Sequence, residues 1–178
     1  MSKEINSLIA NYANIYASFE KFQKSGKLSN GDQKTGVIAE YYAKCYIDTT
    51  FNVNAEYAKP GECYDISYTY KGKHIRVQVK GVSAHSKTRI IAPLNIELDN
   101  GKASFDYLYL ISLDEYFKPN GFYINTYEEI KKKMKEKNDS RKKIQGASMQ
   151  GKNKKGYWLF DFSKNISNEM NKAIKQHN

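Results

Sequence analysis

The chain has few cysteines and no long apolar run. Cys45 and Cys63 are its two cysteines, and they lack metal-ligand spacing, so we expect reduced thiols in a cytoplasmic protein. No apolar run approaches the roughly 18 residues of a membrane span. The opening MSKEINSL lacks the apolar stretch of a signal peptide. Membrane-spanning and exported classes are therefore not expected, and 178 residues are enough for one domain with a real core.

Acidic residues are scarce in one part of the chain. From Lys131 to Lys155 there are 11 Lys or Arg and 2 acids, whereas the remainder has 18 basic and 17 acidic residues. A basic segment on a balanced body favours a polyanion partner such as DNA, although a solvated lysine-rich helix face is the simpler alternative. The candidate DNA contacts are Lys87, Arg89, Arg141, Lys142, Lys143, Lys152, Lys154 and Lys155.

The stretch from Asp65 to Lys80, DISYTYKGKHIRVQVK, has two alternating apolar and polar runs around Lys71-Gly72. This pattern predicts an antiparallel hairpin with Gln78 and Lys80 on its polar face. A two-residue turn sets a register that puts Asp65 opposite Gln78, with Cβ atoms about 4.5–5.5 Å apart. A carboxylate, an amide and an ammonium then converge, which suits a divalent cation and a phosphate. The alternative is a surface hairpin with ordinary polar residues.

Asp65 followed by Gln78-Val79-Lys80 resembles the motif of the PD-(D/E)XK phosphodiesterase superfamily. Tyr64 stands where the motif has proline, and Gln78 replaces the second acid. The resemblance covers about residues 36–134. It implies an α/β fold with a restriction-endonuclease-like core, in which a mixed β-sheet is flanked by α-helices.

The same resemblance implies a Mg²⁺-dependent endodeoxyribonuclease in which Mn²⁺ can substitute. Asp65, the side-chain oxygen of Gln78 and the carbonyl of Val79 would hold the ion. Lys80 would position the water that attacks phosphorus, which leaves 3′-hydroxyl and 5′-phosphate ends in this superfamily.

A further acid usually comes from the helix before the hairpin, and Glu40 matches it here as a catalytic residue and metal ligand. The sequence predicts that helix from about Gln33 to Tyr46, with Asn30 and Asp32 as candidate caps. A surface ion pair between Glu40 and Lys44 is the alternative role. Glu56 or Glu62 is the alternative third acid.

A type II-like restriction endonuclease is the first interpretation, because small stand-alone chains with a basic loop are typical of that class by resemblance. A symmetric duplex site would then require a homodimer. A junction-resolving or repair nuclease, a catalytically inactive DNA-binding module on the same fold, and a structural protein solubilised by its lysines are the alternatives.

The predicted organisation is a single domain over residues 1–178. It has an N-terminal helix (1–27), a catalytic core (33–134), a basic mobile loop (135–156), and a final strand and helix (157–178). Residues 103–113 predict a strand covered on both faces, and Thr126 predicts a helix start. Apolar residues at helical spacing predict a buried stripe on the first helix, made of Ile5, Leu8, Ile9, Tyr12, Ile15, Tyr16 and Phe19.

Overall fold

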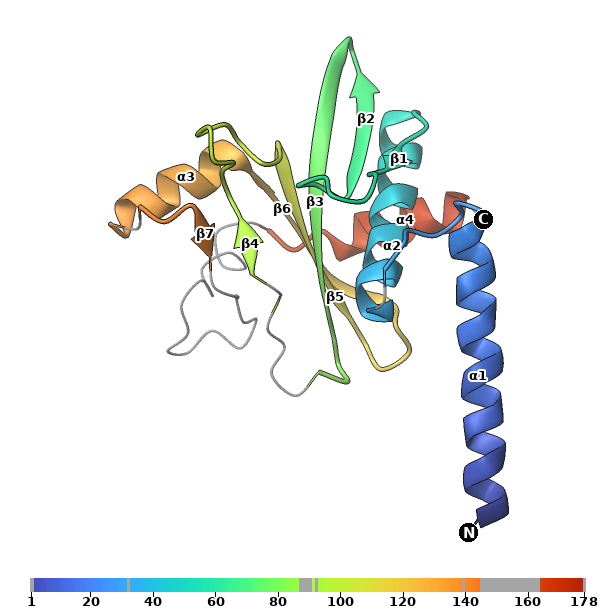
Figure 1. The fold of residues 1–178 in the computed structure, drawn as a ribbon. Coiled ribbons are helices and arrows are strands. Elements are labelled where there is room, and N and C mark those ends of the chain that lie inside the picture. The colour runs from blue at the N-terminus through green and yellow to red at the C-terminus, as the bar shows by residue number, and fades with distance from the viewer. Residues whose placement is uncertain are drawn as a thin grey trace.

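The structure is a computed structural model that describes residues 2–31, 33–86, 91, 93–138, 140–144 and 164–177. It is an α/β fold in which helices cover both faces of a five-stranded mixed sheet (Figure 1). The predicted fold class is therefore confirmed. The strand predicted after residue 157 and most of the predicted basic loop lie outside the described residues.

The main sheet has the strand order β1-β2-β3-β5-β6. Strands β3 and β5 run parallel, and the other neighbours run antiparallel. A small second sheet pairs β4 with β7. The strands are β1 Glu56–Tyr57, β2 Ile66–Tyr70, β3 Lys73–Ser83, β4 Leu94–Asn95, β5 Tyr107–Leu113, β6 Pro119–Thr126 and β7 Lys143–Ile144.

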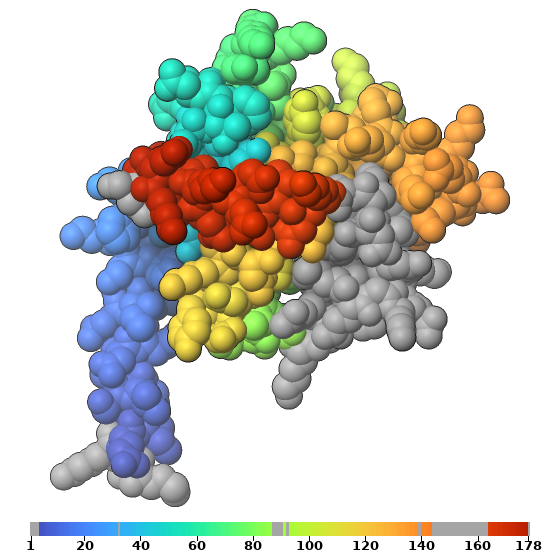
Figure 2. All heavy atoms as spheres, turned by 180° about the vertical axis from the view of Figure 1, so that it is seen from behind, coloured from blue at the N-terminus to red at the C-terminus, as the bar shows by residue number. Residues whose placement is uncertain are grey.

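The helices are α1 Ser2–Lys24, α2 Lys34–Phe51, α3 Tyr127–Glu136 and α4 Ser167–His177. Helices α2 and α4 lie on one face of the sheet, whereas α3 lies on the other with β4 (Figure 1). Helix α1 extends away from this body (Figures 1 and 2). None of the helices in the described ranges is long and apolar enough to cross a membrane.

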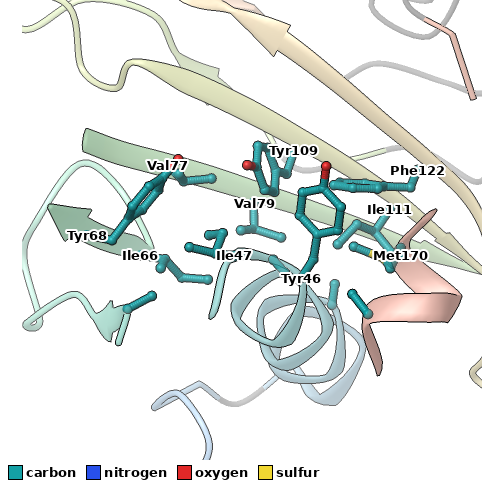
Figure 3. Close-up of a cluster of buried hydrophobic side chains, with 14 of the residues drawn as sticks. Tyr46, Ile47, Ile66, Tyr68, Val77, Val79, Tyr109, Ile111, Phe122 and Met170 are labelled. Atoms are coloured by element: carbon teal, nitrogen blue, oxygen red, sulfur yellow. The ribbon is translucent and has the colours of Figure 1, made fainter. Parts of the chain in front are cut away.

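Strand β5 is buried on both faces, as its largely apolar sequence predicts, with Ser112 as a buried polar residue. Tyr109 and Ile111 point towards α2 and α4, where they join Tyr46 and Met170 in one core cluster (Figure 3). Leu108 and Leu110 belong to the second cluster, under α3. Because successive side chains of a strand alternate, a strand covered on both faces is apolar at nearly every position.

The hairpin of β2 and β3 has the predicted turn and register. Lys71 and Gly72 adopt φ angles of 50° and 77°, as a two-residue type I′ turn requires. The predicted register holds from the turn to the pair Ile66 and Val77. Beyond that pair the Asp65 amide also donates to the Val77 carbonyl, and Asp65 contacts Gln78 through their side chains.

Three expectations need correction. Helix α2 starts at Lys34, close to the predicted Gln33, but its N-cap residue is Gln33 rather than Asn30 or Asp32. It ends at Phe51 rather than at Tyr46, because Ile47 continues its buried face. The segment predicted as a mobile loop from residue 135 includes the last turn of α3 and strand β7. The stripe on α1 is exposed, because this helix does not pack along the body.

Candidate active site

The site begins with the close approach of α2 to strand β3. A Cβ atom added at Gly81 would lie 2.7 Å from the Cβ of Ala39 and 3.2 Å from the carbonyl oxygen of Thr35. Only a residue without a side chain fits there. Glycine after Lys80 therefore lets α2 lie against the end of the hairpin, which brings Glu40 to the sheet.

Asp65 directly precedes the first residue of β2, and its carboxylate continues the hydrogen bonding of the hairpin. The Val79 amide donates to Oδ2 of Asp65 at 2.7 Å, and the Asp65 amide donates to the carbonyl of Val77 at 2.9 Å. The N–H and C=O of a strand residue point towards the same neighbour, so the carbonyl of Val79 also faces Asp65. These contacts fix the carboxylate beside the backbone of Val79.

Gln78 reaches the same carboxylate through its amide nitrogen. Its Nε2 donates a short hydrogen bond to Oδ2 of Asp65 and lies 3.4 Å from the carbonyl oxygen of Val79. The side chain is 8% exposed, so it is held away from solvent. The structure therefore brings Gln78 to Asp65, as predicted. The amide nitrogen of Gln78 makes the contact, although the prediction was that its amide oxygen would serve as a metal ligand.

Two adjoining cavities meet at Glu40 and Asp65. The first has a volume of about 420 Å³, and its lining includes Glu40, Asp65, Val79 and Lys80. The second, of about 370 Å³, is also lined by Glu40 and Asp65. Four of the predicted site residues therefore share one concave surface between α2 and the end of the hairpin.

Both carboxyl groups have a raised pKa. Burial and the nearby charge of Asp65 raise the pKa of Glu40 to about 7, while the Ser29 hydroxyl and the Lys80 ammonium oppose the rise. Burial likewise raises the pKa of Asp65, against the Val79 amide and the charge of Lys80. The two acids are thus close enough to disfavour each other's ionisation, and Lys80 acts on both.

The structure distinguishes Glu40 from the other acids that could have joined Asp65. Lys44 pairs with Asp48 at 2.6 Å, so the ion pair considered between Glu40 and Lys44 is not formed. Glu56 is exposed on the edge strand β1, outside both cavities. Glu62 is exposed at the rim of the smaller cavity. Of these acids, Glu40 shares both cavities with Asp65.

The predicted DNA contacts are only partly described. Arg141, Lys142 and Lys143 are exposed, and they lie on the α3 side of the sheet because β7 pairs with β4. None of these three lines either cavity. The other candidates, Lys87, Arg89, Lys152, Lys154 and Lys155, lie outside the described residues.

Sequence reasoning missed several residues that shape the cavities. The loop through Ser29 and Gly31 closes one wall, and the buried amide of Gln23 holds this loop by donating to both carbonyl oxygens at 2.7 and 3.0 Å. Tyr57 lines the smaller cavity, and its buried hydroxyl has no hydrogen-bond partner among the described residues. Of these features, the sequence offered a signal only for the close approach of α2, because a glycine, Gly81, directly follows Lys80 of the motif.

The donor set suits a hard divalent cation. Glu40 and Asp65 offer carboxylate oxygens and Val79 offers a carbonyl, which are the ligands that Mg²⁺ prefers. A cation between the two acids would relieve the unfavourable burial of their charges. In the described part of the chain, no three His, Cys, Asp or Glu side chains could hold a metal by themselves. That number is not needed, because Mg²⁺ usually keeps several waters and takes one or two carboxylates.

Comparison with known proteins adds a distant structural likeness. No protein-family model matches the sequence, and no curated protein matches it. Among solved structures, a bacterial homing endonuclease has a TM-score of 0.41 and 17% sequence identity over 83% of this chain and 97% of its own. At such a low TM-score, the site must be judged on its own residues.

Proposed function

We propose that the protein is a Mg²⁺-dependent endonuclease that hydrolyses phosphodiester bonds of DNA. The observation that carries the proposal is the cavity in which Glu40, Asp65 and Lys80 meet, with both acids at raised pKa. An acid whose main role is a structural ion pair has a lowered pKa, because the opposite charge favours its ionised form. Two destabilised acids beside a lysine in a cavity are instead typical of a functional site.

Glu40, Asp65 and the carbonyl of Val79 would hold the ion. When bound, Mg²⁺ supplies charge stabilisation at the scissile phosphate. Gln78 keeps the Asp65 carboxylate in place through its amide hydrogen bond. This positioning role replaces the direct oxygen ligand that the motif predicts.

Lys80 is the residue best placed to handle the nucleophile. Its ammonium shares the cavity with both acids, and it can donate a hydrogen bond to the attacking water. The water oxygen forms a bond to phosphorus and releases a proton to solvent as the bond from phosphorus to the 3′ oxygen breaks, and that oxygen leaves as a hydroxyl after it takes a proton from solvent. The products are 3′-hydroxyl and 5′-phosphate ends, as the resemblance implies.

Within this function, the proposed class is a type II-like restriction enzyme of the PD-(D/E)XK superfamily. Its proposed location is the cytoplasm. A junction-resolving or repair nuclease remains the alternative enzyme. The replacement of the second acid by Gln78, bonded through nitrogen, favours a catalytically inactive DNA-binding module as the alternative outside enzymes. End mapping separates these three, because they predict discrete fragments, structure-dependent cuts, or binding without cuts.

The decisive experiment is plasmid cleavage in Mg²⁺ or Mn²⁺ by wild type, Asp65→Asn and Lys80→Ala. Each variant should lose at least about 10³-fold in rate, since an interaction made in the transition state is removed. Filter binding in EDTA should show DNA affinity unchanged within about threefold, because phosphate contacts elsewhere dominate affinity.

Lys172→Ala is the matched control for the loss of one lysine, since Lys172 is exposed on α4 and lies outside both cavities. It should cleave like wild type. Cleavage that survives both Asp65→Asn and Lys80→Ala would eliminate this site as the catalytic centre.

A further inference from the structure

Helix α1 presents an apolar face to solvent. Seven of its large apolar side chains are 39–67% exposed. Within the described residues these side chains are left largely open, because the helix projects from the body, and near its base Lys34 lies over Tyr16 and Lys27 over Phe22 (Figures 1 and 2). They are Ile5, Leu8, Ile9, Tyr12, Ile15, Tyr16 and Phe22. Contiguous exposed apolar surface of this kind marks an interaction site.

The spacing on this face is that of a coiled coil. Six apolar residues follow one another at alternating steps of three and four, which are the a and d positions of a heptad. In order, they are Ile5, Leu8, Tyr12, Ile15, Phe19 and Phe22, and we call this set the α1 seam. A helix that packs on a globular core has no need of so regular a 3.5-residue repeat.

The charges of α1 avoid the seam. Glu20, Lys21 and Lys24 occupy the outer b, c and f positions of the heptads, and Glu4 is the one charged residue beside the seam among the described side chains. Ile9 stands at an e position and widens the apolar face. No like charges therefore oppose a second copy of the same helix.

The base of α1 is fixed to the body. Gln23 is buried and accepts a hydrogen bond from Nζ of Lys34 at 3.0 Å. Lys34 also lies 3.6 Å from Oε1 of Glu20 and 4.5 Å from the ring centre of Tyr16. The helix is thus a projecting arm with a defined direction, and its outer turns have room for a partner.

We propose that α1 pairs antiparallel with α1 of a second copy of this chain. The seven exposed side chains offer roughly 770 Å² per copy, if a wholly exposed large side chain has about 200 Å². A stable interface needs about 800 Å² per partner. A pair of 23-residue helices is about 34 Å long. In the antiparallel pair the two bodies lie at opposite ends, so each body also lies beside the outer turns of the partner's α1 and adds contact area there.

The antiparallel direction follows from side-chain size. If Ile5 faces the partner's Phe22, then Leu8 faces the partner's Phe19 and Tyr12 faces the partner's Ile15. Every layer then joins one aromatic ring to one aliphatic side chain. A parallel pair would stack each residue on its own copy, with two rings in some layers and two aliphatic groups in others. Layers of similar volume keep the distance between the two helix axes constant along the pair, which favours the antiparallel arrangement.

The first test is sedimentation equilibrium of the full chain. Wild type should be a dimer at micromolar concentration, and Leu8→Glu combined with Ile15→Glu should be a monomer, with at least a 100-fold weaker association. Ala10→Glu combined with Ala17→Glu is the matched control, since these exposed alanines at f positions receive the same charges on the same helix. This control should remain a dimer.

Oxidative cross-linking tests the direction. Asn11→Cys combined with Ser18→Cys puts thiols at g positions that flank each other in the antiparallel pair, so a covalent dimer should form much faster than with either single variant. Wild type, with Cys45 and Cys63, gives the background. Equal cross-linking by the singles and the double would overturn the antiparallel direction.

Other occupants of the α1 seam give other results. A wild type that is monomeric at about 100 μM would overturn the proposal, as would a seam variant that stays dimeric. A monomer that floats with anionic lipid vesicles through α1 would show a membrane surface as the occupant instead. Circular dichroism of the seam variant should keep the signal of the body, so a loss of association is not mistaken for unfolding.

Discussion

The cavity at the end of the hairpin and the seam of α1 break opposite rules of folding. The cavity partly buries the charges of Glu40 and Asp65, whereas α1 exposes apolar groups such as Leu8. Buried charge and contiguous exposed apolar surface both cost free energy in an isolated chain. Each would be explained by the ligand that we propose for it, a cation and a phosphate in the cavity and a second copy of the chain on α1.

The difference between the two regions lies in how they are supported. Asp65 is held by the Val79 amide and by Gln78, and Gly81 allows α2 to close over it. Among the residues that the structure describes, helix α1 is held at its base, through Gln23 and the residues around it. A catalytic site needs side chains held in fixed positions. A helical association surface needs apolar residues at the right spacing on a stable helix. The same contrast predicts which substitutions matter.

Outside the proposed catalytic residues, the largest effect is expected from Gly81→Ala. The added methyl group would lie 2.7 Å from the Cβ of Ala39, so α2 must move and carry Glu40 away from Asp65. We expect a loss of about 1–3 kcal/mol in the free energy of unfolding from overpacking. Cleavage should fall at least about 100-fold, because a displacement of about 1 Å is enough for that loss. Urea denaturation and the plasmid assay measure the two effects.

Gly36→Ala is the control for that substitution. A methyl group at Gly36 would have ordinary van der Waals contact, 3.8 Å from Oε1 of Glu40, and alanine favours the helix. The free energy of unfolding should stay equal or rise by up to about 1 kcal/mol. Equal losses of stability in both variants would show that the close approach of α2 to β3 has no special role.

A smaller effect is expected from Ile9→Ala on α1. Ile9 is 61% exposed, so in dilute monomer the free energy of unfolding should change by less than about 0.5 kcal/mol. At concentrations where the dimer forms, the cost should grow, because association stabilises the folded chain by mass action. Urea denaturation at two protein concentrations measures this difference. A large cost at both concentrations would mean that α1 packs within its own chain.

Much of the sheet could be predicted from sequence because its signals are local. Lys71-Gly72 specifies a two-residue turn, and the alternation around it sets the register that aligns Asp65 with Gln78. The capping box of Thr126 and Glu129 is likewise a short-range signal, and both its hydrogen bonds form. Local chemistry determines such features almost alone.

The rest depends on long-range packing. The apolar spacing of α1 predicts a buried stripe, but periodicity does not say whether the covering surface belongs to the same chain. The choice of Glu40 over Glu56 and Glu62 depends on how close α2 comes to β3, which a single glycine decides. Which atom of Gln78 meets Asp65 depends on side-chain rotation, which no sequence pattern encodes.

Thermal unfolding of wild type and Glu40→Gln from pH 5 to pH 8, in EDTA and in Mg²⁺, tests the shared cation site most directly. The pKa of Glu40 is raised from 4.5 to about 7, so the folded chain binds more protons than the unfolded chain between these values. The metal-free wild type should therefore lose stability, on the order of 2 kcal/mol, as the pH rises through this range. Glu40→Gln should lose less.

At pH 8, Mg²⁺ should restore the stability of wild type, because the ion binds the folded state and compensates the two carboxylates. It should stabilise Glu40→Gln much less. The same pH slope and the same response to Mg²⁺ in both proteins would contradict a cation site between Glu40 and Asp65.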